Sequence, residues 1–393
     1  MPVPSSAYAG LKVLDLSQGI AGPVAAALLA RQGASVIKVE PPRGDWMRGA
    51  GGGREGMTAN AIAGNLNKRS LAIDAAHAQG RAVLRQLAQG ADVLIENFRP
   101  GVMARLELDY ATLAGNNPAL VYCSISGFGT SGPWVGKAGT DSVLQAYAGM
   151  AAINSAPGTP PRRMGLYVPD NITALYAAQA IGAALYARAT QADKRGRHIE
   201  ISLVECCAAF QAAPITDALL FPDAATKPAV LAPAGEFEAS DGWLVAAALD
   251  DAMFARMAKA LDHAQWAGDE RYAGTDARRA RAKEVNAMVA AVIATGARDA
   301  WIARLEQADV LCSPVNDYHA LLEHAQMRHM GYMRDIAQAP YGELRVPQLP
   351  ASNVAPTGAP RIGEHSRAIL REAGMAPQEI EQLVAAGVVR ALD

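Results

Sequence analysis

The chain of 393 residues lacks the features that mark several classes of protein. Its four cysteines, Cys123, Cys206, Cys207 and Cys312, have neither metal-ligand spacing nor the pattern of a disulfide framework, so we expect a reducing, cytoplasmic setting. No apolar run is long enough to cross a bilayer, and the opening MPVPSS has no signal-peptide character. A net charge of −2 gives no basic excess for phosphate contacts, so we expect neither a membrane nor a nucleic-acid partner.

Several catalytic motifs are also missing. There is no G-x-G-x-x-G fingerprint, no P-loop and no G-x-S-x-G elbow, which disfavours a nicotinamide dehydrogenase, a P-loop nucleotidase and a serine hydrolase. His319, His324 and His329 are spaced by five, which places them on different faces of a helix. We therefore predict no metal site.

Residues 11–45 hold the most informative pattern that is present. They predict a strand (Leu11–Leu16), a turn through Ala21-Gly22-Pro23, a helix of small residues and a second strand (Ser35–Val39). This order is typical of a βαβ unit and hence of a parallel sheet. Ligands of such sheets bind at the carboxyl ends of the strands.

The alternation continues along the first half of the chain. Further strands are predicted at Arg69–Asp74, Asp92–Asn97, Leu120–Ser126 and His198–Leu203, and helices at Ala78–Gln89, Ile172–Arg188 and Val204–Ala213. We expect an α/β fold with three parts: a doubly wound, Rossmann-like large domain (1–220), a smaller α+β domain (221–330) and a linker with a C-terminal helix returning to the large domain (331–393). The small domain opens with a predicted hairpin, Gly235–Ala239 and Trp243–Ala248.

Three segments at predicted strand ends are candidate ligand contacts. Lys68 and Arg69 are either phosphate donors or part of a solvated turn. In Glu96-Asn-Phe-Arg-Pro-Gly101, Asn97 can bind an amide and Phe98 can pack an apolar chain, while Arg99 or Arg105 can meet phosphate. The glycine-rich loop 127–133 either cradles a ligand with its amides or is a simple connection.

Asp170 comes just before the Ala-rich helix. It is either the N-cap of that helix or a nucleophile for attack on a thioester, and the two roles are compatible. Amide donors and the helix dipole are predicted to keep its carboxylate ionised.

Together these segments resemble the class III CoA-transferase family, of the CaiB/BaiF and formyl-CoA transferase type. The resemblance is carried by LKVLDLSQGIAGP, VIKVEPPRGD, NLNKRSLAID, ADVLIENFRPG, NPALVYCSISGFGTSGP, the aspartate before the Ala-rich helix, GRHIEISLVE and the DGWL hairpin. It covers most of the chain in order.

The resemblance implies a ring-shaped subunit in an interlocked homodimer and a transfer of CoA between an acyl-CoA and a small carboxylic acid. Asp170 matches the family's nucleophile, which forms an aspartyl anhydride and then an aspartyl-CoA thioester. Coenzyme A enters as a substrate, and neither a permanently bound cofactor nor a metal is implied. Coenzyme A contacts carry over to Ile20, Ala21, Arg43, Ile73, Asp74, Ala75, Ala76, Asn97, Phe98, Arg99, Arg105, Lys137, Ala138, Gly139, Thr140 and Asp141.

Two departures from the formyl-CoA transferases predict a carboxylic acid larger than formate or oxalate. Ile20 replaces a glutamine, and the glycine quartet of their lid is absent near Ala232-Pro-Ala-Gly235. Arg162 or Arg163 is a candidate for recognising a second carboxylate.

Two other functions remain open. The related α-methylacyl-CoA racemases carry Gly-His-Asp where this chain has Gly139-Thr140-Asp141, and threonine is no general base near neutral pH. A CoA-ester-binding protein without turnover is the third possibility.

Overall fold

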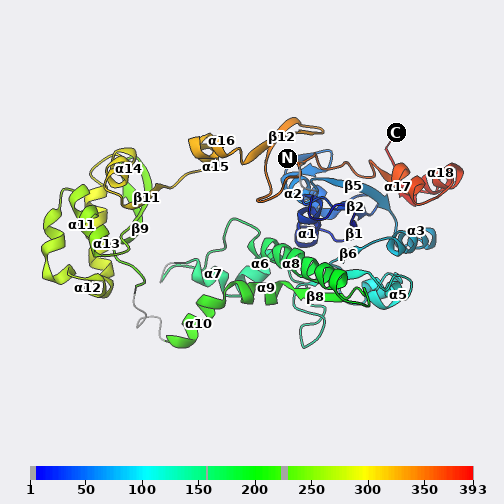
Figure 1. Cartoon of the computed structure of the whole chain (residues 1–393), viewed down its shortest axis with the longest axis horizontal. Helices are drawn as coiled ribbons and strands as arrows, with labels where there is room; N and C mark the ends of the chain where they lie inside the picture. The colour runs from blue at the N-terminus through cyan, green and yellow to red at the C-terminus, as the bar shows by residue number, and fades with distance from the viewer. Residues whose placement is uncertain (1–5, 156–157, 223–228, 393) are drawn as a thin grey trace. The chain divides into compact units, whose positions relative to one another are not determined.

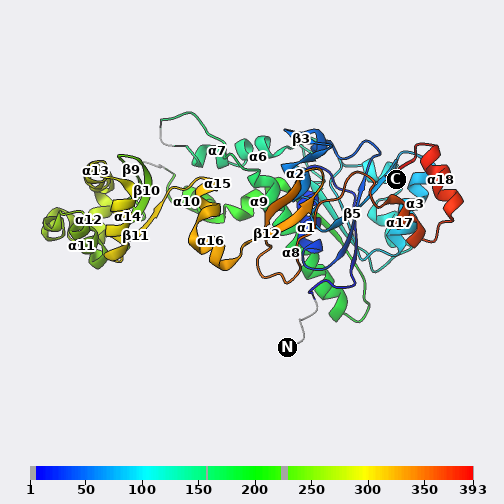
Figure 2. The same ribbon diagram turned by 90° about the horizontal axis from the view of Figure 1, so that it is seen from above.

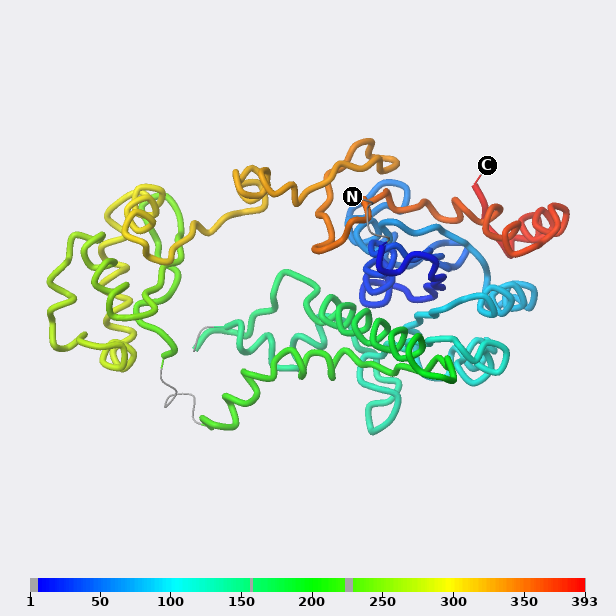
Figure 3. The backbone as a smooth tube through the Cα atoms, in the orientation of Figure 1, coloured from blue at the N-terminus to red at the C-terminus, as the bar shows by residue number. Residues whose placement is uncertain are grey.

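The computed structural model describes residues 6–155, 158–222 and 229–392. The chain forms two compact units. Unit 1 comprises residues 1–212 and 332–393, and unit 2 comprises residues 213–331. The chain thus leaves unit 1 once and returns to it once, as the tube in Figure 3 shows.

Unit 1 is built on a seven-stranded sheet with the order β14-β5-β2-β1-β6-β7-β8. Six of the strands are parallel, and the two-residue β14 pairs antiparallel with β5. The strands are β1 (Lys12–Asp15), β2 (Ser35–Glu40), β5 (Lys68–Ile73), β6 (Val93–Glu96), β7 (Val121–Ser126), β8 (His198–Ser202) and β14 (Val389–Arg390). The predicted α/β fold with a mainly parallel sheet is therefore confirmed.

Helices cover both faces of this sheet because neighbouring strand residues point to opposite sides. On one face, Val13 and Val93 pack against the alanine-rich helices α1 (Ala21–Ala30) and α8 (Val168–Thr190). On the other, Leu14 and Leu94 pack against α3 (Ala78–Gln89), α17 (Ser366–Glu372) and α18 (Pro377–Ala385). Figures 1 and 2 both place α3, α17 and α18 together at one side of the sheet.

The other elements of unit 1 are short. They are η1 (Trp46–Gly49), β3 (Gly53–Arg54), β4 (Met57–Thr58), α2 (Ala59–Ala63), α4 (Val102–Arg105), α5 (Tyr110–Ala114), α6 (Asp141–Tyr147), α7 (Met150–Ile153), α9 (Leu203–Phe210), β12 (Met333–Gln338) and β13 (Gly342–Pro347). Within the described residues, no single helix has both the length and the apolarity to cross a membrane. One bent pair, α9 with α10 (Ala212–Leu220), meets that test jointly, with a 65° bend.

Unit 2 has its own antiparallel sheet and its own core. The strand order is β11-β10-β9, with β9 at Ala234–Ala239, β10 at Gly242–Ala247 and β11 at Leu311–Pro314, which confirms the predicted hairpin. Phe237, Leu244, Phe254 and Leu305 lie in its core. Its helices after α10 are α11 (Asp251–Ala260), η3 (Ala264–Gly268), η4 (Glu270–Tyr272), α12 (Thr275–Ala280), α13 (Ala282–Ile293), α14 (Arg298–Gln307), α15 (Tyr318–Glu323) and α16 (Ala325–Met330). Residues 223–228, near the start of the predicted small domain, lie outside the described residues.

A buried ionic cluster corrects the prediction for Lys68 and Arg69. Lys68 Nζ is fully buried, 2.6 Å from Asp15 Oδ2, and also donates to the carbonyl of Pro23. Arg69 donates both guanidinium nitrogens to Glu372 at 2.8 Å. Both cations are therefore paired with carboxylates of unit 1. Lys68 is neither a phosphate-binding residue nor part of a solvated turn.

Candidate active site

The carboxyl ends of β1 and β6 adjoin at the centre of the sheet, where the strand order reverses. This is the place where open α/β sheets bind ligands. Asn97, just after β6, joins the two loops: its side chain accepts from the Gln18 amide at 2.8 Å and donates to the Gln18 carbonyl at 2.7 Å. The loop that leads into α1 is therefore fixed by the loop that follows β6.

A second anchor holds the same loop from the side of β2. The buried Asp45 carboxylate accepts from the Gly19 amide at 3.1 Å and from Lys38 Nζ at 2.9 Å. Gly22 allows α1 to begin this close to the sheet, because a Cβ there would lie 2.2 Å from Ser17 Cβ. No described side chain caps α1, so its first amides remain available to a ligand.

A cavity of about 730 Å³, which we call the Asp170 cavity, opens at these loop ends. It brings together eleven of the predicted site residues: Ile20, Ala21, Asn97, Phe98, Arg99, Lys137, Ala138, Gly139, Thr140, Asp141 and Asp170. Arg163 also lines it, and Arg162 is not among its described lining residues.

A neighbouring cavity of about 510 Å³, the Asp74 cavity, holds the next predicted group, Arg43 with Ile73, Asp74, Ala75 and Ala76. Gln18 and Phe98 line both this cavity and the Asp170 cavity, so the two adjoin. Of the predicted coenzyme contacts, only the exposed Arg105 is absent from the described lining of both.

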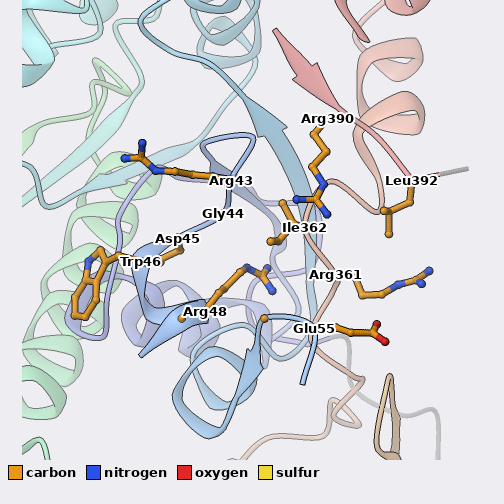
Figure 4. A pocket seen from close by; sticks show the side chains of 12 residues that line it. Arg43, Gly44, Asp45, Trp46, Arg48, Glu55, Arg361, Ile362, Arg390 and Leu392 are labelled. Atoms are coloured by element: carbon orange, nitrogen blue, oxygen red, sulfur yellow. The ribbon is translucent and has the colours of Figure 1, made fainter. Parts of the chain in front are cut away.

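A third cavity, of about 630 Å³, is also lined by Arg43 and extends over the residues that follow it, Gly44 to Gly49 (Figure 4). Its buried Arg48 donates to both carboxylate oxygens of Glu40, at 2.7 and 2.8 Å. Figure 4 shows the guanidinium groups of Arg48 and Arg390 on either side of Ile362. Asp170 is not among the described residues that line this cavity. Through its bonds to Glu40, Arg48 stabilises the loop that follows β2.

Asp170 lies inside the first turn of its helix, which corrects the prediction of an N-cap. Helix α8 begins at Val168, and the N-cap is Tyr167. The proline before Asp170 is the second helical residue, a position that proline favours because its missing N–H costs nothing in the first turn. The Asp170 backbone amide donates to Asp141 Oδ2 at 3.4 Å.

The environment of Asp170 also corrects the prediction that its carboxylate stays ionised. Burial, and secondarily the negative charge of Asp141, raises the pKa of Asp170 to about 7. Burial likewise raises the pKa of Asp141, while Gln145, the Asp170 amide and Arg163 oppose that shift. The negative charge of Asp141 therefore disfavours ionisation of Asp170.

The loop 127–139 borders the Asp170 cavity and closes on itself. Its ends meet at two glycines, since a Cβ on Gly127 would lie 2.9 Å from the Gly139 Cα. Lys137 extends from this loop over the Trp134 ring, 3.2 Å from its centroid. Trp134 packs edge-on against Phe128 at 5.0 Å. The loop thus presents a cation and backbone amides to the cavity on a small aromatic cluster.

Sequence reasoning did not single out Gln145 and Asp45, although both are buried at the site. The signal for Gln145 is its spacing of four from Asp141, which becomes informative only once a helix is assigned there. Among the described residues, no group of three or more histidine, cysteine or acidic side chains is arranged to hold a metal ion.

These features define an α/β protein with an elongated ligand site at the sheet's switch point and a partly buried carboxyl at its end. The model of CoA-transferase family III matches residues 8–366, and the chain belongs to that family. It is an enzyme with CoA-transferase activity.

Similar proteins include a succinate–glutarate CoA-transferase of Agrobacterium fabrum, 31% identical over 95% of this chain and 97% of that protein. The succinyl-CoA:glutarate CoA-transferase of Homo sapiens is 29% identical over 97% of this chain and 89% of its own length. Among solved structures, a CaiB/BaiF family protein from Brucella suis is 32% identical with a TM-score of 0.83, covering 94% of this chain and all of that chain.

Proposed function

We propose that the enzyme transfers CoA from an acyl-CoA to a dicarboxylic acid, with Asp170 as the nucleophile. The observation that carries the proposal is the position of Asp170, a partly buried carboxyl whose pKa is raised to about 7, in a cavity with Lys137 and unpaired helix amides. A carboxylate that ionises near neutral pH inside a water-poor site is a competent nucleophile toward a thioester.

The proposed reaction proceeds through two kinds of intermediate. The Asp170 carboxylate attacks the acyl carbonyl, the C–S bond breaks, and CoA thiolate leaves. The product on the enzyme is a mixed anhydride between Asp170 and the donor acid. The thiolate attacks the Asp170 carbonyl, which releases the donor acid and forms an aspartyl-CoA thioester. The acceptor carboxylate then attacks this thioester, the C–S bond breaks, and CoA thiolate leaves, which gives a second anhydride between Asp170 and the acceptor. The thiolate finally attacks the acceptor carbonyl, which yields the new acyl-CoA and regenerates the Asp170 carboxylate.

Each predicted contact has a place in this scheme. We propose that the thioester lies in the Asp170 cavity and that the coenzyme extends past Phe98 into the Asp74 cavity toward Arg43. Backbone amides at the start of α1 and in the loop 127–139 are suited to stabilise the oxyanions of the tetrahedral intermediates. Lys137 and Arg99, which both line the Asp170 cavity, supply positive charge for phosphate or carboxylate groups.

The choice of a dicarboxylic acid rests on Arg163. This exposed arginine lines the Asp170 cavity and acts electrostatically on Asp141. Relatives named for succinate and glutarate agree with an acid that carries a second carboxylate. We expect Arg163→Gln to lower kcat/KM for succinate or glutarate by about tenfold to a hundredfold, the usual worth of a charge-assisted hydrogen bond.

The neighbouring arginine provides the matched control for this experiment. Arg162 is exposed like Arg163 but is not among the described residues that line the cavity. We expect Arg162→Gln to retain wild-type kcat/KM, and both variants to match the wild type with a monocarboxylic acid such as butyrate, which has no second carboxylate. Equal losses in the two variants would refute a specific role for Arg163.

The nucleophile itself is tested by trapping. The purified enzyme is incubated with succinyl-CoA, glutaryl-CoA and butyryl-CoA, reduced with borohydride, and the peptide that contains Asp170 is analysed by mass spectrometry. Reduction of an aspartyl thioester or anhydride converts the residue to homoserine. We expect this mark with the dicarboxylic donors, and neither the mark nor transfer in Asp170→Ala.

Two outcomes would contradict the proposal. Exchange of the substrate's α-proton with solvent deuterium, without a mark on Asp170, would favour the racemase. Binding of the acyl-CoA without either reaction would favour a CoA-ester-binding protein.

We further propose the interlocked homodimer that the family resemblance implies. It is supported by apolar side chains that unit 1 leaves exposed on three helices: Ile153 on α7, Leu175 and Tyr186 on α8, and Phe210 on α9, each at least 60% exposed. Apolar side chains in such number on one unit are typical of an interaction surface. Light scattering should give about twice the 41.1 kDa of one chain, and a monomer mass would contradict the proposal.

A further inference from the structure

Gln145 is a buried glutamine beside the site, and its whole side-chain amide is engaged. It lies on α6, is 1% exposed, and belongs to none of the described cavity linings. Its Nε2 group donates to Asp141 Oδ1 at 2.7 Å and to the Leu166 carbonyl at 3.0 Å. Its Oε1 atom accepts from the Met164 amide at 2.8 Å.

These bonds connect two segments that meet at Asp170. Asp141 begins α6, and its other carboxylate oxygen accepts the backbone amide of Asp170 at 3.4 Å. Met164 and Leu166 belong to the segment that leads into α8, so Gln145 holds that segment by two backbone groups. The amide therefore links Asp141, the entry to α8 and, through both, Asp170.

We infer that Gln145 is a positioning residue, which orients the Asp141 carboxylate and the entry of α8 so that Asp170 is held for attack on the thioester. The inference rests on the proposed function of Asp170 as nucleophile. Geometry favours this role over simple packing, because a side chain that only filled space would not need three directed hydrogen bonds to two separate segments.

A second consequence concerns the charge on Asp141. The Gln145 donor stabilises the ionised form of Asp141, and that charge disfavours ionisation of Asp170. Among the described residues, the other titratable or charged groups that face the pair are Arg163, Lys137, Arg99 and Tyr167 on the cavity wall and Cys207 on α9. Without the Gln145 donor, Asp141 favours its neutral form, and Asp170 ionises at lower pH.

The test replaces Gln145 with methionine, which keeps the length of the side chain and its helix propensity while removing the amide. Gln211 offers a matched control in the same unit. It is also a buried glutamine, and its Nε2 group donates to the backbone carbonyls of Ala148 and Cys207 at 2.9 and 3.1 Å. Gln211 contacts neither Asp141 nor the entry to α8 among the described hydrogen bonds.

For Gln145→Met we expect kcat to fall by about tenfold to a hundredfold, with little change in the KM for acyl-CoA, because the coenzyme contacts remain. We also expect the pH midpoint of Asp170 trapping by borohydride to move to lower pH. Gln211→Met should leave that midpoint unchanged. If Gln145→Met does not fold, Asp141→Asn gives the same readout, since it removes the charge and keeps an acceptor for Gln145.

The outcomes separate this inference from the proposed function. If wild-type Asp170 is never trapped, the proposed function fails. If wild-type Asp170 is trapped and Gln145→Met has wild-type kcat and an unshifted midpoint, the inference alone is wrong. The inference is also wrong if Gln145→Met and Gln211→Met lower kcat equally with no shift of the midpoint, because that result marks a structural role.

Discussion

The burial of Asp170 should lower the stability of the folded enzyme in a pH-dependent way. Its pKa rises from the ordinary 3.8 to about 7 in the folded state, mainly through burial and then through Asp141. Between these two values the unfolded chain releases the proton and the folded chain keeps it. The free energy of unfolding therefore falls as pH rises from about 4 to 7, and the full cost applies above pH 7.

The variant Asp170→Asn isolates this cost, because an amide of the same shape carries no charge at any of these pH values. Wherever the folded chain holds one proton more than the unfolded chain, the free energy of unfolding falls by about 1.4 kcal/mol for each pH unit. We expect the stability advantage of Asp170→Asn over wild type to grow by about 2.5 kcal/mol between pH 5 and pH 8, almost all of it below pH 7, where the advantage begins to level off.

The measurement is denaturant unfolding of both proteins at pH 5, 6, 7 and 8, at one protein concentration. Asp193→Asn is the control, since Asp193 is an exposed loop carboxylate whose one described hydrogen bond is accepted locally, from the Arg195 backbone amide. Its difference from wild type should not vary with pH. An advantage of Asp170→Asn that is constant or shrinks from pH 5 to pH 8 would refute the reasoning.

Three further predictions concern catalysis and the frame of the site. The single-turnover rate of Asp170 acylation should fall about tenfold per pH unit below pH 7 and be flat above it; stopped-flow assays that find a constant rate from pH 5 to 7 would contradict this. Lys68→Met should lower the free energy of unfolding by about 3–5 kcal/mol, because it removes the ion-pair partner that lies 2.6 Å from the buried Asp15 carboxylate. Arg69→Met, which breaks a partly exposed pair, should cost less than about 1 kcal/mol in the same denaturation experiment, and similar costs for both would be evidence against the buried pair. Asn97→Ala should raise the KM for acyl-CoA about tenfold through loss of two loop-joining hydrogen bonds, and an unchanged KM would argue against that role.

Much of unit 1 could be predicted from the sequence because its signals are local. Helix α3 spans the predicted Ala78–Gln89, and β7 begins one residue after the predicted Leu120. Apolar, β-branched runs between turn residues identify strands that are covered on both faces. Strand β14 was missed because two residues, Val389 and Arg390, give no periodic signal, and their pairing with β5 is set by tertiary structure.

The sequence predicts which residues form the site better than it predicts their ionisation. The motifs that resemble the family point to the residues now found together in the Asp170 and Asp74 cavities. The ionisation of Asp170 could not be read from the sequence, because burial and the approach of Asp141 depend on the fold. The same holds for Lys68, whose carboxylate partner Asp15 is 53 residues away in the sequence.

The division of unit 1 between the two ends of the chain constrains how the protein can be synthesised. The outer edge of β5 and the apolar face of α3 are covered by β14, α17 and α18, all of which emerge from the ribosome after residue 360. Until then a growing chain exposes an open strand edge and an uncovered core, both of which favour aggregation. Unit 2, residues 213–331, is synthesised before these C-terminal elements and has a core of its own. We therefore expect unit 2 to fold during translation, while unit 1 completes its fold only near the end of synthesis.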